Sequence, residues 1–302
     1  MKVRHIIESQ QFSRQWLEKE LFPLAQEMEE IVSAGHSDIL AGKCMLIAFY
    51  EPSTRTYMSF TAAMKRLGGE VIYSMEYAGT SSLAKGKTIE DTIRGLCSCC
   101  PDVIVLRTNK EGMAKRAAEV SAVPIINAGD GMGQHPTQAL LDIYTIQKEL
   151  GHIDGISIAM VGDLARNRTV RSLSYLLGNF SGIKIYFVSP EVARIRDDIK
   201  DFLERHNVPF YEEHALRMVA PKVDVIYQTR TQKERGALLE RFETTVNREI
   251  LGLMKKDAII MHPLPRNEEI SPEVDNDPRA VYFRQAKNGL YVRMALLKMI
   301  LT

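Results

Sequence analysis

A four-residue motif, Ser53-Thr54-Arg55-Thr56, constrains the fold of this chain more than any other feature of its sequence. It follows an apolar run at residues 44–49, typical of a buried strand, and precedes apolar residues at helical spacing over residues 57–67. The strand therefore ends at a helix N-terminus, where free backbone N–H groups and the helix dipole favour an anion. The arginine adds a planar fork of donors that matches phosphate oxygens. The motif thus predicts a phosphate site made without a glycine-rich loop.

An ordinary helix cap is the alternative interpretation of the motif, because Ser and Thr are common capping residues. Capping requires one hydroxyl group, whereas the motif supplies three together with an arginine. This excess favours the phosphate site.

The composition indicates a globular protein without nucleic-acid or membrane partners. The chain has 302 residues, which suits one large or two medium domains, with 45% hydrophobic and 25% charged residues. Its formal net charge of +1 gives no overall attraction to polyanions. The N-terminus lacks the apolar core of a signal peptide, and no apolar stretch approaches the roughly 20 residues that span a bilayer. We therefore expect a cytoplasmic protein.

The cysteines and histidines form no metal-binding pattern in the sequence. Three of the four cysteines lie in a CSCC sequence at residues 97–100, without CxxC spacing or a neighbouring histidine. The seven histidines show no HExxH pattern. We expect free thiols and no metal.

Strand and helix patterns alternate along the chain. Strands are predicted at residues 44–49, 71–74, 103–106 and 123–126, and in a second series at 157–161, 184–188, 223–227 and 258–261. Helices are predicted at residues 9–34, 55–67, 88–98, 111–119, 136–149, 168–179, 191–206 and 285–301. This alternation predicts an α/β fold of two doubly wound domains, each a parallel sheet flanked by helices. We place the domains at residues 1–135 and 136–285, with the C-terminal helix, 286–302, returning to the first.

Polar residues collect directly after the predicted strands. Besides the motif at 53–56, they are Arg107, Gln134 to Gln138, Asp163, Arg168, Thr229, Arg230, Gln232 and His262 to Arg266. In open parallel sheets, ligands bind beyond the carboxyl ends of the strands. We therefore expect these groups to converge on one cleft between the two domains.

The expected cleft contains four arginines, namely Arg55, Arg107, Arg168 and Arg230, together with His135. Four converging positive charges require anionic ligands, because they would otherwise repel one another. The sequence therefore predicts a phosphate compound on the first domain and a carboxylate compound on the second. Since no acid–base carboxylate pair or Ser–His–acid constellation is evident, the site should orient and polarise a reactant that is already activated.

A dinucleotide site is the competing interpretation of the glycines at residues 129, 131 and 133. Their spacing is GxGxG rather than GxGxxG, and no acidic residue ends a following strand at the expected distance. We expect instead that the glycines shape a turn that presents His135, and that the protein uses no cofactor.

Six sequence segments resemble the catalytic chains of the aspartate carbamoyltransferase family, in order and over nearly the whole length. They are FYEPSTRT, LRTNKEG, NAGDGMGQHPTQALLDIYTI, AMVGD, TRTQKER and MHPLPR. The STRT and HPTQ motifs are shared with ornithine carbamoyltransferases and indicate the aspartate/ornithine superfamily. The aspartate branch is favoured because Arg230 and Gln232 suit a dicarboxylate, HPLPR replaces the HCLP of the ornithine branch, and the SMG motif is absent.

The resemblance implies that the chain transfers the carbamoyl group of carbamoyl phosphate to L-aspartate, a step of pyrimidine biosynthesis. Ser53 to Thr56 and Arg107 would hold the phosphate, and Thr56, Arg107 and His135 would polarise the carbonyl oxygen. The NH₂ group would donate to Gln138 and to the backbone carbonyls of Pro263 and Leu264, with a cis bond expected at Leu264–Pro265. The carboxylates of L-aspartate would bind to Arg168, Arg230 and Gln232.

The polar loop at residues 80–88 reads as a solvated surface loop from its residues alone. In the family, the equivalent loop reaches the active site of the neighbouring subunit. The resemblance therefore implies that Ser81 and Lys85 contact carbamoyl phosphate, that Lys85 also contacts aspartate, and that the active unit is a homotrimer with shared sites. The sequence does not decide whether regulatory chains attach or whether larger assemblies form.

Three departures from the family pattern bear on function. Tyr57 stands where the family usually has Arg, and Ala84 replaces a basic residue; both should alter the surroundings of the phosphate. The stretch Ala165-Arg166-Asn167 replaces one that usually contains Lys, and could change aspartate affinity or domain closure.

Two alternatives to an aspartate carbamoyltransferase stay open. They are a transcarbamylase for another carboxylated amine and a non-catalytic paralogue.

Overall fold

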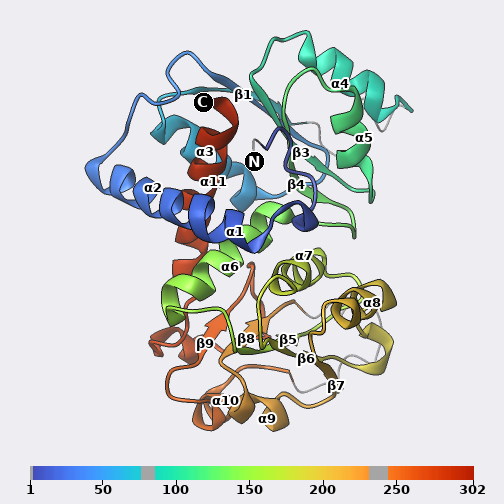
Figure 1. Cartoon of the computed structure of the whole chain (residues 1–302), viewed down its shortest axis with the longest axis vertical. Helices are drawn as coiled ribbons and strands as arrows, with labels where there is room; N and C mark the ends of the chain where they lie inside the picture. Colours follow the sequence, from blue (N-terminus) through green and yellow to red (C-terminus); the bar gives the residue numbers. More distant parts are fainter. Residues whose placement is uncertain (1–2, 76–85, 231–243) are drawn as a thin grey trace. The chain divides into compact units, whose positions relative to one another are not determined.

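The computed structural model describes residues 3–75, 86–230 and 244–302. The chain forms two compact units, Met1–Leu141 with Asn288–Thr302, and Asp142–Lys287 (Figure 1). The boundaries between them fall inside helices α6 (Pro136–Leu150) and α11 (Tyr282–Leu301).

The first unit is built on a four-stranded parallel sheet in the order β2-β1-β3-β4. The strands are β1 (Cys44–Phe49), β2 (Glu70–Met75), β3 (Val103–Thr108) and β4 (Ile125–Asp130). In the pairing of β1 with β3, Phe49 lies opposite Arg107. The residues that follow β1 and the last residues of β3 therefore lie at the same edge of the sheet.

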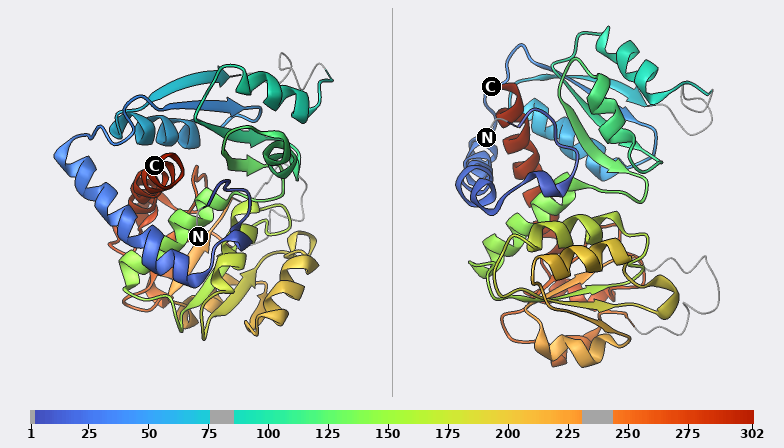
Figure 2. Two further views of the ribbon diagram at one scale, coloured as in Figure 1. Left: turned by 45° about the horizontal axis from the view of Figure 1, so that its top comes forward. Right: turned by 45° about the vertical axis from the view of Figure 1, so that its right-hand side comes forward.

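Helices cover both faces of this sheet. The helices are α1 (Arg14–Trp16), α2 (Phe22–Ala34), α3 (Thr54–Arg66), α4 (Ile89–Cys97) and α5 (Met113–Val120). Side chains of α4 and α5, including Ile93 and Ala117, pack with Leu46 and Ile104 of the sheet in one core cluster. The C-terminal part of α11 lies beside α2 and α3 (Figure 2). Lys298 donates to Glu27 of α2, and Arg293 donates to Ser59 of α3.

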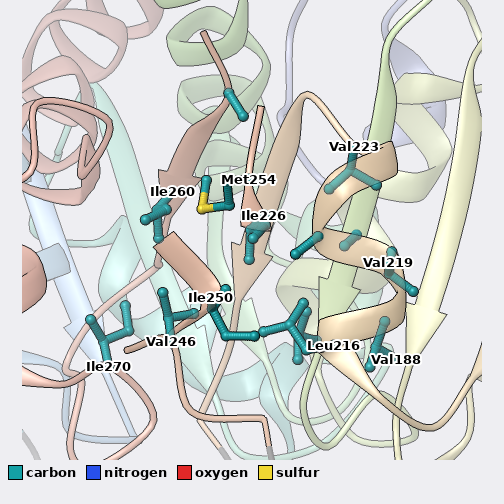
Figure 3. Packing of buried hydrophobic residues seen from close by; sticks show 14 of the residues in the cluster. Val188, Leu216, Val219, Val223, Ile226, Val246, Ile250, Met254, Ile260 and Ile270 are labelled. Atoms are coloured by element: carbon teal, nitrogen blue, oxygen red, sulfur yellow. The ribbon is translucent and has the colours of Figure 1, made fainter. Parts of the chain in front are cut away.

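The second unit carries a five-stranded parallel sheet in the order β7-β6-β5-β8-β9. The strands are β5 (Ser157–Val161), β6 (Lys184–Val188), β7 (Phe210–Glu213), β8 (Val225–Gln228) and β9 (Ile259–Met261). Helices α7 (Arg168–Leu177) and α8 (Asp197–Arg205) lie on one face, and α9 (Leu216–Val219) and α10 (Arg248–Leu253) on the other. Figure 3 shows the core under α9 and α10, where Leu216, Val219 and Ile250 pack against Ile226 and Ile260 of the strands.

The predicted α/β class, with two parallel sheets flanked by helices and a returning C-terminal helix, is confirmed. Strands β4 and β8 begin two residues later than predicted. In the first case Pro124 lacks the N–H group that a ladder requires, and in the second Asp224 accepts a hydrogen bond from Ser157 N instead of extending the apolar run. Strand β7 was missed because it is a half-buried edge strand with the sequence FYEE.

The helix predicted over roughly residues 9–34 is confirmed for residues 14–34 but is wrong in its start and in its regularity. The structure has a 3₁₀ turn at Ser9–Gln11, the short helix α1, a π-helical turn at Leu17–Leu21, and then α2. The change from the π turn to α2 occurs beside Pro23, which cannot donate a backbone hydrogen bond.

All four cysteines are free thiols, and Cys99 and Cys100 are exposed. No group of three or more metal-ligand side chains occurs within the described ranges. Across the same residues, no helix combines the length and the apolarity needed to cross a membrane.

Candidate active site

The phosphate motif forms the N-terminus of α3, as the sequence predicts. Ser53 is the N-cap residue in extended conformation, but its side chain makes no capping hydrogen bond. Its hydroxyl donates instead to Thr56 Oγ1 at 3.1 Å. The hydroxyl groups are therefore not used up in capping, and the first-turn N–H groups lack partners within the helix. This geometry favours the anion site over the ordinary cap.

Arg55 projects from the first turn of α3 and is exposed. Burial of part of its side chain lowers the pKa of its guanidinium group below its usual value. An arginine stays charged at neutral pH nevertheless. Among the described residues, no carboxylate pairs with it. A partly desolvated guanidinium group at a helix N-terminus is a favourable place for a phosphate.

Arg107, near the end of β3, is buried and fixed in orientation. Its Nη1 donates to Ala128 O at 3.0 Å, and its Nη2 donates to Glu51 Oε1 at 2.5 Å. Glu51 lies two residues before Ser53, so this ion pair links β3 to the phosphate motif. Sequence reasoning missed Glu51; its place inside the FYEPSTRT segment was the available signal.

A turn after β4 leads to His135. Gly131 has φ +56°, and a Cβ atom there would lie 2.8 Å from Glu111 N, so the position requires glycine. The buried Asp130 holds the turn, since its carboxylate accepts from Gln134 N at 2.6 Å and from Gly112 N at 3.0 Å. Burial raises the pKa of Asp130, while these hydrogen bonds oppose the rise. The glycines therefore shape a turn, as expected.

His135 and Gln138 lie at the start of α6 and are both buried. His135 Nδ1 lies 3.4 Å from Thr137 Oγ1, and His135 O accepts from Gln138 N at 3.0 Å. The first unit thus carries two arginines, a histidine and several hydroxyl groups at the carboxyl ends of β1, β3 and β4 or directly after them. This set of groups suits a phosphate compound with a carbonyl group to be polarised.

In the second unit, Arg168 is the first residue of α7 and is half-buried. Asn167 is the N-cap: its Oδ1 accepts from Thr169 N at 3.0 Å, from Val170 N at 3.2 Å and from Thr169 Oγ1 at 2.7 Å. The departure from the family pattern at residues 165–167 therefore contains the residue that fixes the start of α7 and the position of Arg168.

We expect Asn167→Ala to destabilise the protein by about 1 kcal/mol, because it removes an N-cap, and to raise the KM for the acceptor substrate through Arg168. Thermal unfolding and steady-state kinetics would measure both effects. Asn167→Asp is the matched control, since it keeps a capping oxygen. Equal losses in the two variants would contradict this account of Asn167.

The segment after β8 brings Arg230 to the same edge. Thr229 donates to Val161 O from both its N and its Oγ1, at 2.9 and 2.7 Å. This close approach requires glycine at Gly162, where φ is +126° and a Cβ atom would lie 2.5 Å from Thr229 Oγ1. Arg230 is exposed. Its Nε donates to the side-chain oxygen of Asn267 at 3.2 Å, in the amide orientation that turns this oxygen toward the arginine.

The segment after β9, His262 to Arg266, has an unusual backbone. The peptide bond Leu264–Pro265 is cis, as predicted, and Leu264 has φ +55°. Arg266 anchors the end of the segment, where it pairs with Asp275 and donates to Tyr282 Oη at 2.8 Å. Because β5, β8 and β9 are neighbours in the sheet, Arg168, Arg230 and this segment share one edge. That edge suits a carboxylate ligand together with a group that donates hydrogen bonds.

Several predicted residues cannot be placed. Ser81, Lys85, Gln232 and Ala84 lie outside the described residues. Tyr57 is described, and its ring lies 6.1 Å from that of Phe49 and 5.5 Å from that of Tyr73. Its effect on phosphate binding stays a prediction.

Two family models match the chain. One is described as aspartate/ornithine carbamoyltransferase, carbamoyl-P binding domain, and matches residues 4–148. The other, aspartate/ornithine carbamoyltransferase, Asp/Orn binding domain, matches residues 154–300.

Individual relatives agree with these matches. The chain is 55% identical to a chloroplastic aspartate carbamoyltransferase of Arabidopsis thaliana, over 98% of this chain and 77% of the relative. It is 53% identical to that of Oryza sativa subsp. japonica, over 100% and 86%. A crystal structure of aspartate transcarbamoylase from Trypanosoma cruzi with N-(phosphonacetyl)-L-aspartic acid superimposes with a TM-score of 0.92 at 42% identity, covering 100% of this chain and 97% of that one.

The expectation of a cytoplasmic protein is wrong. The plant relatives at 53–55% identity are named as chloroplastic aspartate carbamoyltransferases, which contradicts that expectation. Composition and charge could not reveal this, because they describe the folded domain and carry no information about the compartment in which it works.

Proposed function

Because the chain belongs to the aspartate/ornithine carbamoyltransferase family, we propose that it transfers the carbamoyl group of carbamoyl phosphate to the α-amine of L-aspartate. The products are N-carbamoyl-L-aspartate and phosphate, in a step of pyrimidine biosynthesis. The observation that carries the proposal is the first turn of α3, where an arginine without a described carboxylate partner accompanies three hydroxyl groups. The likeness to an enzyme solved with a phosphonate joined to aspartate supports it.

The groups of the first unit act on carbamoyl phosphate in this proposal. The N-terminus of α3, with Ser53, Thr54, Arg55 and Thr56, binds the phosphate oxygens, helped by Arg107. Thr56, Arg107 and His135 donate to the carbonyl oxygen and stabilise the negative charge that develops on it. Glu51 holds Arg107 in the orientation that this requires.

The groups of the second unit act on the carbamoyl NH₂ group and on the acceptor. The carbonyl groups of Pro263 and Leu264 accept hydrogen bonds from the carbamoyl NH₂ group, as does Gln138 of the first unit. Arg168, Arg230 and Gln232 bind the carboxylates of L-aspartate. The unprotonated α-amine attacks the carbonyl carbon, the bond from this carbon to the phosphate oxygen breaks, and the departing phosphate can take the amine proton.

The active assembly in this proposal is a homotrimer with shared sites. Support comes from the resemblance of the loop at residues 80–88 to the family loop that reaches the neighbouring subunit, where Ser81 and Lys85 would contact carbamoyl phosphate and Lys85 would contact aspartate as well. Measurement of the solution mass with and without the phosphonate–aspartate analogue would test this assembly.

The proposed activity is tested by product formation with carbamoyl phosphate and either L-aspartate or L-ornithine. We expect N-carbamoyl-L-aspartate from the first pair and no product from the second, because arginines line the acceptor edge. Product with ornithine alone would overturn the aspartate assignment. Product only with another carboxylated amine would favour that acceptor, and no product with any amine would favour a non-catalytic paralogue.

A further inference from the structure

The segment after β9 carries a buried histidine and a buried glutamate, neither of which has a role in the reaction described above. We propose that His262 and Glu269 form a positioning pair that aims the Pro263 carbonyl group at the carbamoyl NH₂ group of the substrate. This inference rests on the proposed function and assigns residues that act through the backbone, without contact to the substrate.

Both ring nitrogens of His262 are engaged. Nδ1 accepts a hydrogen bond from Leu264 N at 2.7 Å, and Nε2 lies 3.0 Å from Glu269 Oε1. A nitrogen that accepts from a backbone N–H group carries no proton, so the ring proton lies on Nε2 and is donated to Glu269. Both side chains are almost fully buried, with exposed fractions of 1% and 5%.

The Leu264 N–H group and the Pro263 carbonyl group belong to the same peptide unit. This bond is trans, and in a planar trans peptide the N–H and C=O bonds point in opposite directions. Because the N–H group points at Nδ1 of the buried His262 ring, the Pro263 carbonyl group must point away from the histidine. A rotation of this peptide would break the bond to Nδ1, so the ring determines the direction of the carbonyl group.

The histidine is itself held from several sides. Its backbone N donates to Gln285 Oε1 at 2.8 Å, and Gln285 Nε2 donates to Asp142 Oδ1 at 2.7 Å. Asp142 Oδ2 accepts from the buried Tyr227 hydroxyl at 2.7 Å. These groups come from α6, β8 and α11, so the position of His262 depends on the packed interior of the second unit rather than on its own loop.

Glu269 is fixed as well. Its backbone O accepts from Val246 N at 3.0 Å. Burial raises the pKa of the Glu269 carboxyl group, but hydrogen bonds from His262 and from backbone N–H groups outweigh this effect and lower the pKa below its usual range. The group is therefore an ionised acceptor at neutral pH, which suits the donor on Nε2. Leu264, with φ +55°, occupies a backbone region that is unfavourable for a non-glycine residue. The hydrogen bond to His262 offsets part of this cost.

Two variants of His262 separate the two ring positions. Asn places an oxygen near the position of Nδ1 and can still accept from Leu264 N, whereas Gln reaches toward Glu269 and leaves Leu264 N without its acceptor. Titration calorimetry would measure binding of carbamoyl phosphate, of acetyl phosphate, which has a methyl group in place of NH₂, and of inorganic phosphate. His206→Gln, at the exposed end of α8, is the matched control.

We expect His262→Gln to bind carbamoyl phosphate about 10-fold more weakly, the effect of one hydrogen bond, with acetyl phosphate and phosphate binding unchanged within about 2-fold. His262→Asn should keep most of the preference for carbamoyl phosphate. Retention of the full preference in a folded His262→Gln variant, or equal weakening of all three ligands, would overturn the inference.

If the His262 variants do not fold, Glu269→Gln and Glu269→Leu provide the same comparison, since only Gln keeps an acceptor for Nε2–H. We expect loss of the preference in Glu269→Leu alone, and equal preferences in the two variants would refute the pair. Product formation by the unaltered protein reports separately on the proposed function. If that protein neither forms product nor prefers carbamoyl phosphate over acetyl phosphate, the function and the inference both fail.

Discussion

Arg55→Ala is expected to lower kcat/KM by about 10³-fold or more, to the limit of detection, while the protein stays folded. The guanidinium group lies at the N-terminus of α3 and has no described carboxylate partner, so its removal deletes a charge that would act on the phosphate alone. Removal of one group that stabilises developing charge costs about 10²- to 10³-fold in other enzymes, and the loss of phosphate binding adds to this. Steady-state kinetics and thermal unfolding would measure the two effects.

The control for this prediction is Arg94→Ala. Arg94 is an exposed arginine of α4 in the same unit and forms a surface ion pair with Asp91, of the kind that contributes little to stability. It should leave kcat/KM unchanged within about 2-fold. A near-normal rate in Arg55→Ala would refute the phosphate assignment, and a rate lost only because the variant unfolds would show a structural role.

Arg230→Ala is expected to raise the KM for L-aspartate by about 100-fold, because it removes a charged hydrogen-bonding partner of a carboxylate. Arg230 is exposed two residues after the end of β8, and its Nε donates to the amide oxygen of Asn267. Because the side chain is exposed, little stability should be lost. The KM for carbamoyl phosphate should change much less.

Arg217→Ala is the matched control for this variant, since Arg217 is an exposed arginine of the same unit that faces Glu249. A panel of amine acceptors adds a second readout: Arg230→Ala should penalise anionic amines far more than cationic ones. Equal losses for both classes, or an unchanged KM for aspartate, would contradict the proposed role of Arg230.

The sequence predicted the elements with strong local signals. Strands β1, β5 and β6 begin and end at the predicted residues, because each is a short, mostly apolar run whose later residues are largely buried in a parallel sheet. The phosphate motif was found for a similar reason, since a strand, a cluster of hydroxyl groups and a helix follow one another within a few residues. The cis bond at Leu264–Pro265 was also predicted, from the family motif that contains it.

Other features depend on residues that are far apart in the chain. Glu51 and Arg107 form an ion pair across 56 positions. The motif around Glu51 indicates that the residue lies near the site, but not which arginine it pairs with. Asn167 was read only as a departure from a family pattern, yet it caps α7. His262 was noted for its place after a strand, but its link to Glu269 and Leu264 was not predicted.

Local pattern by itself determined the α/β class, the order of the strands along the chain and the residue types that gather where strands end. These properties follow from periodicity and from residue chemistry, which act over a few positions. The tertiary structure alone decided which buried polar groups meet, as in the pairing of Asp142 with Gln285 across 143 positions. Such a pairing forms because the packed core places both groups out of reach of water, where each must find a partner, and that placement exists only after folding.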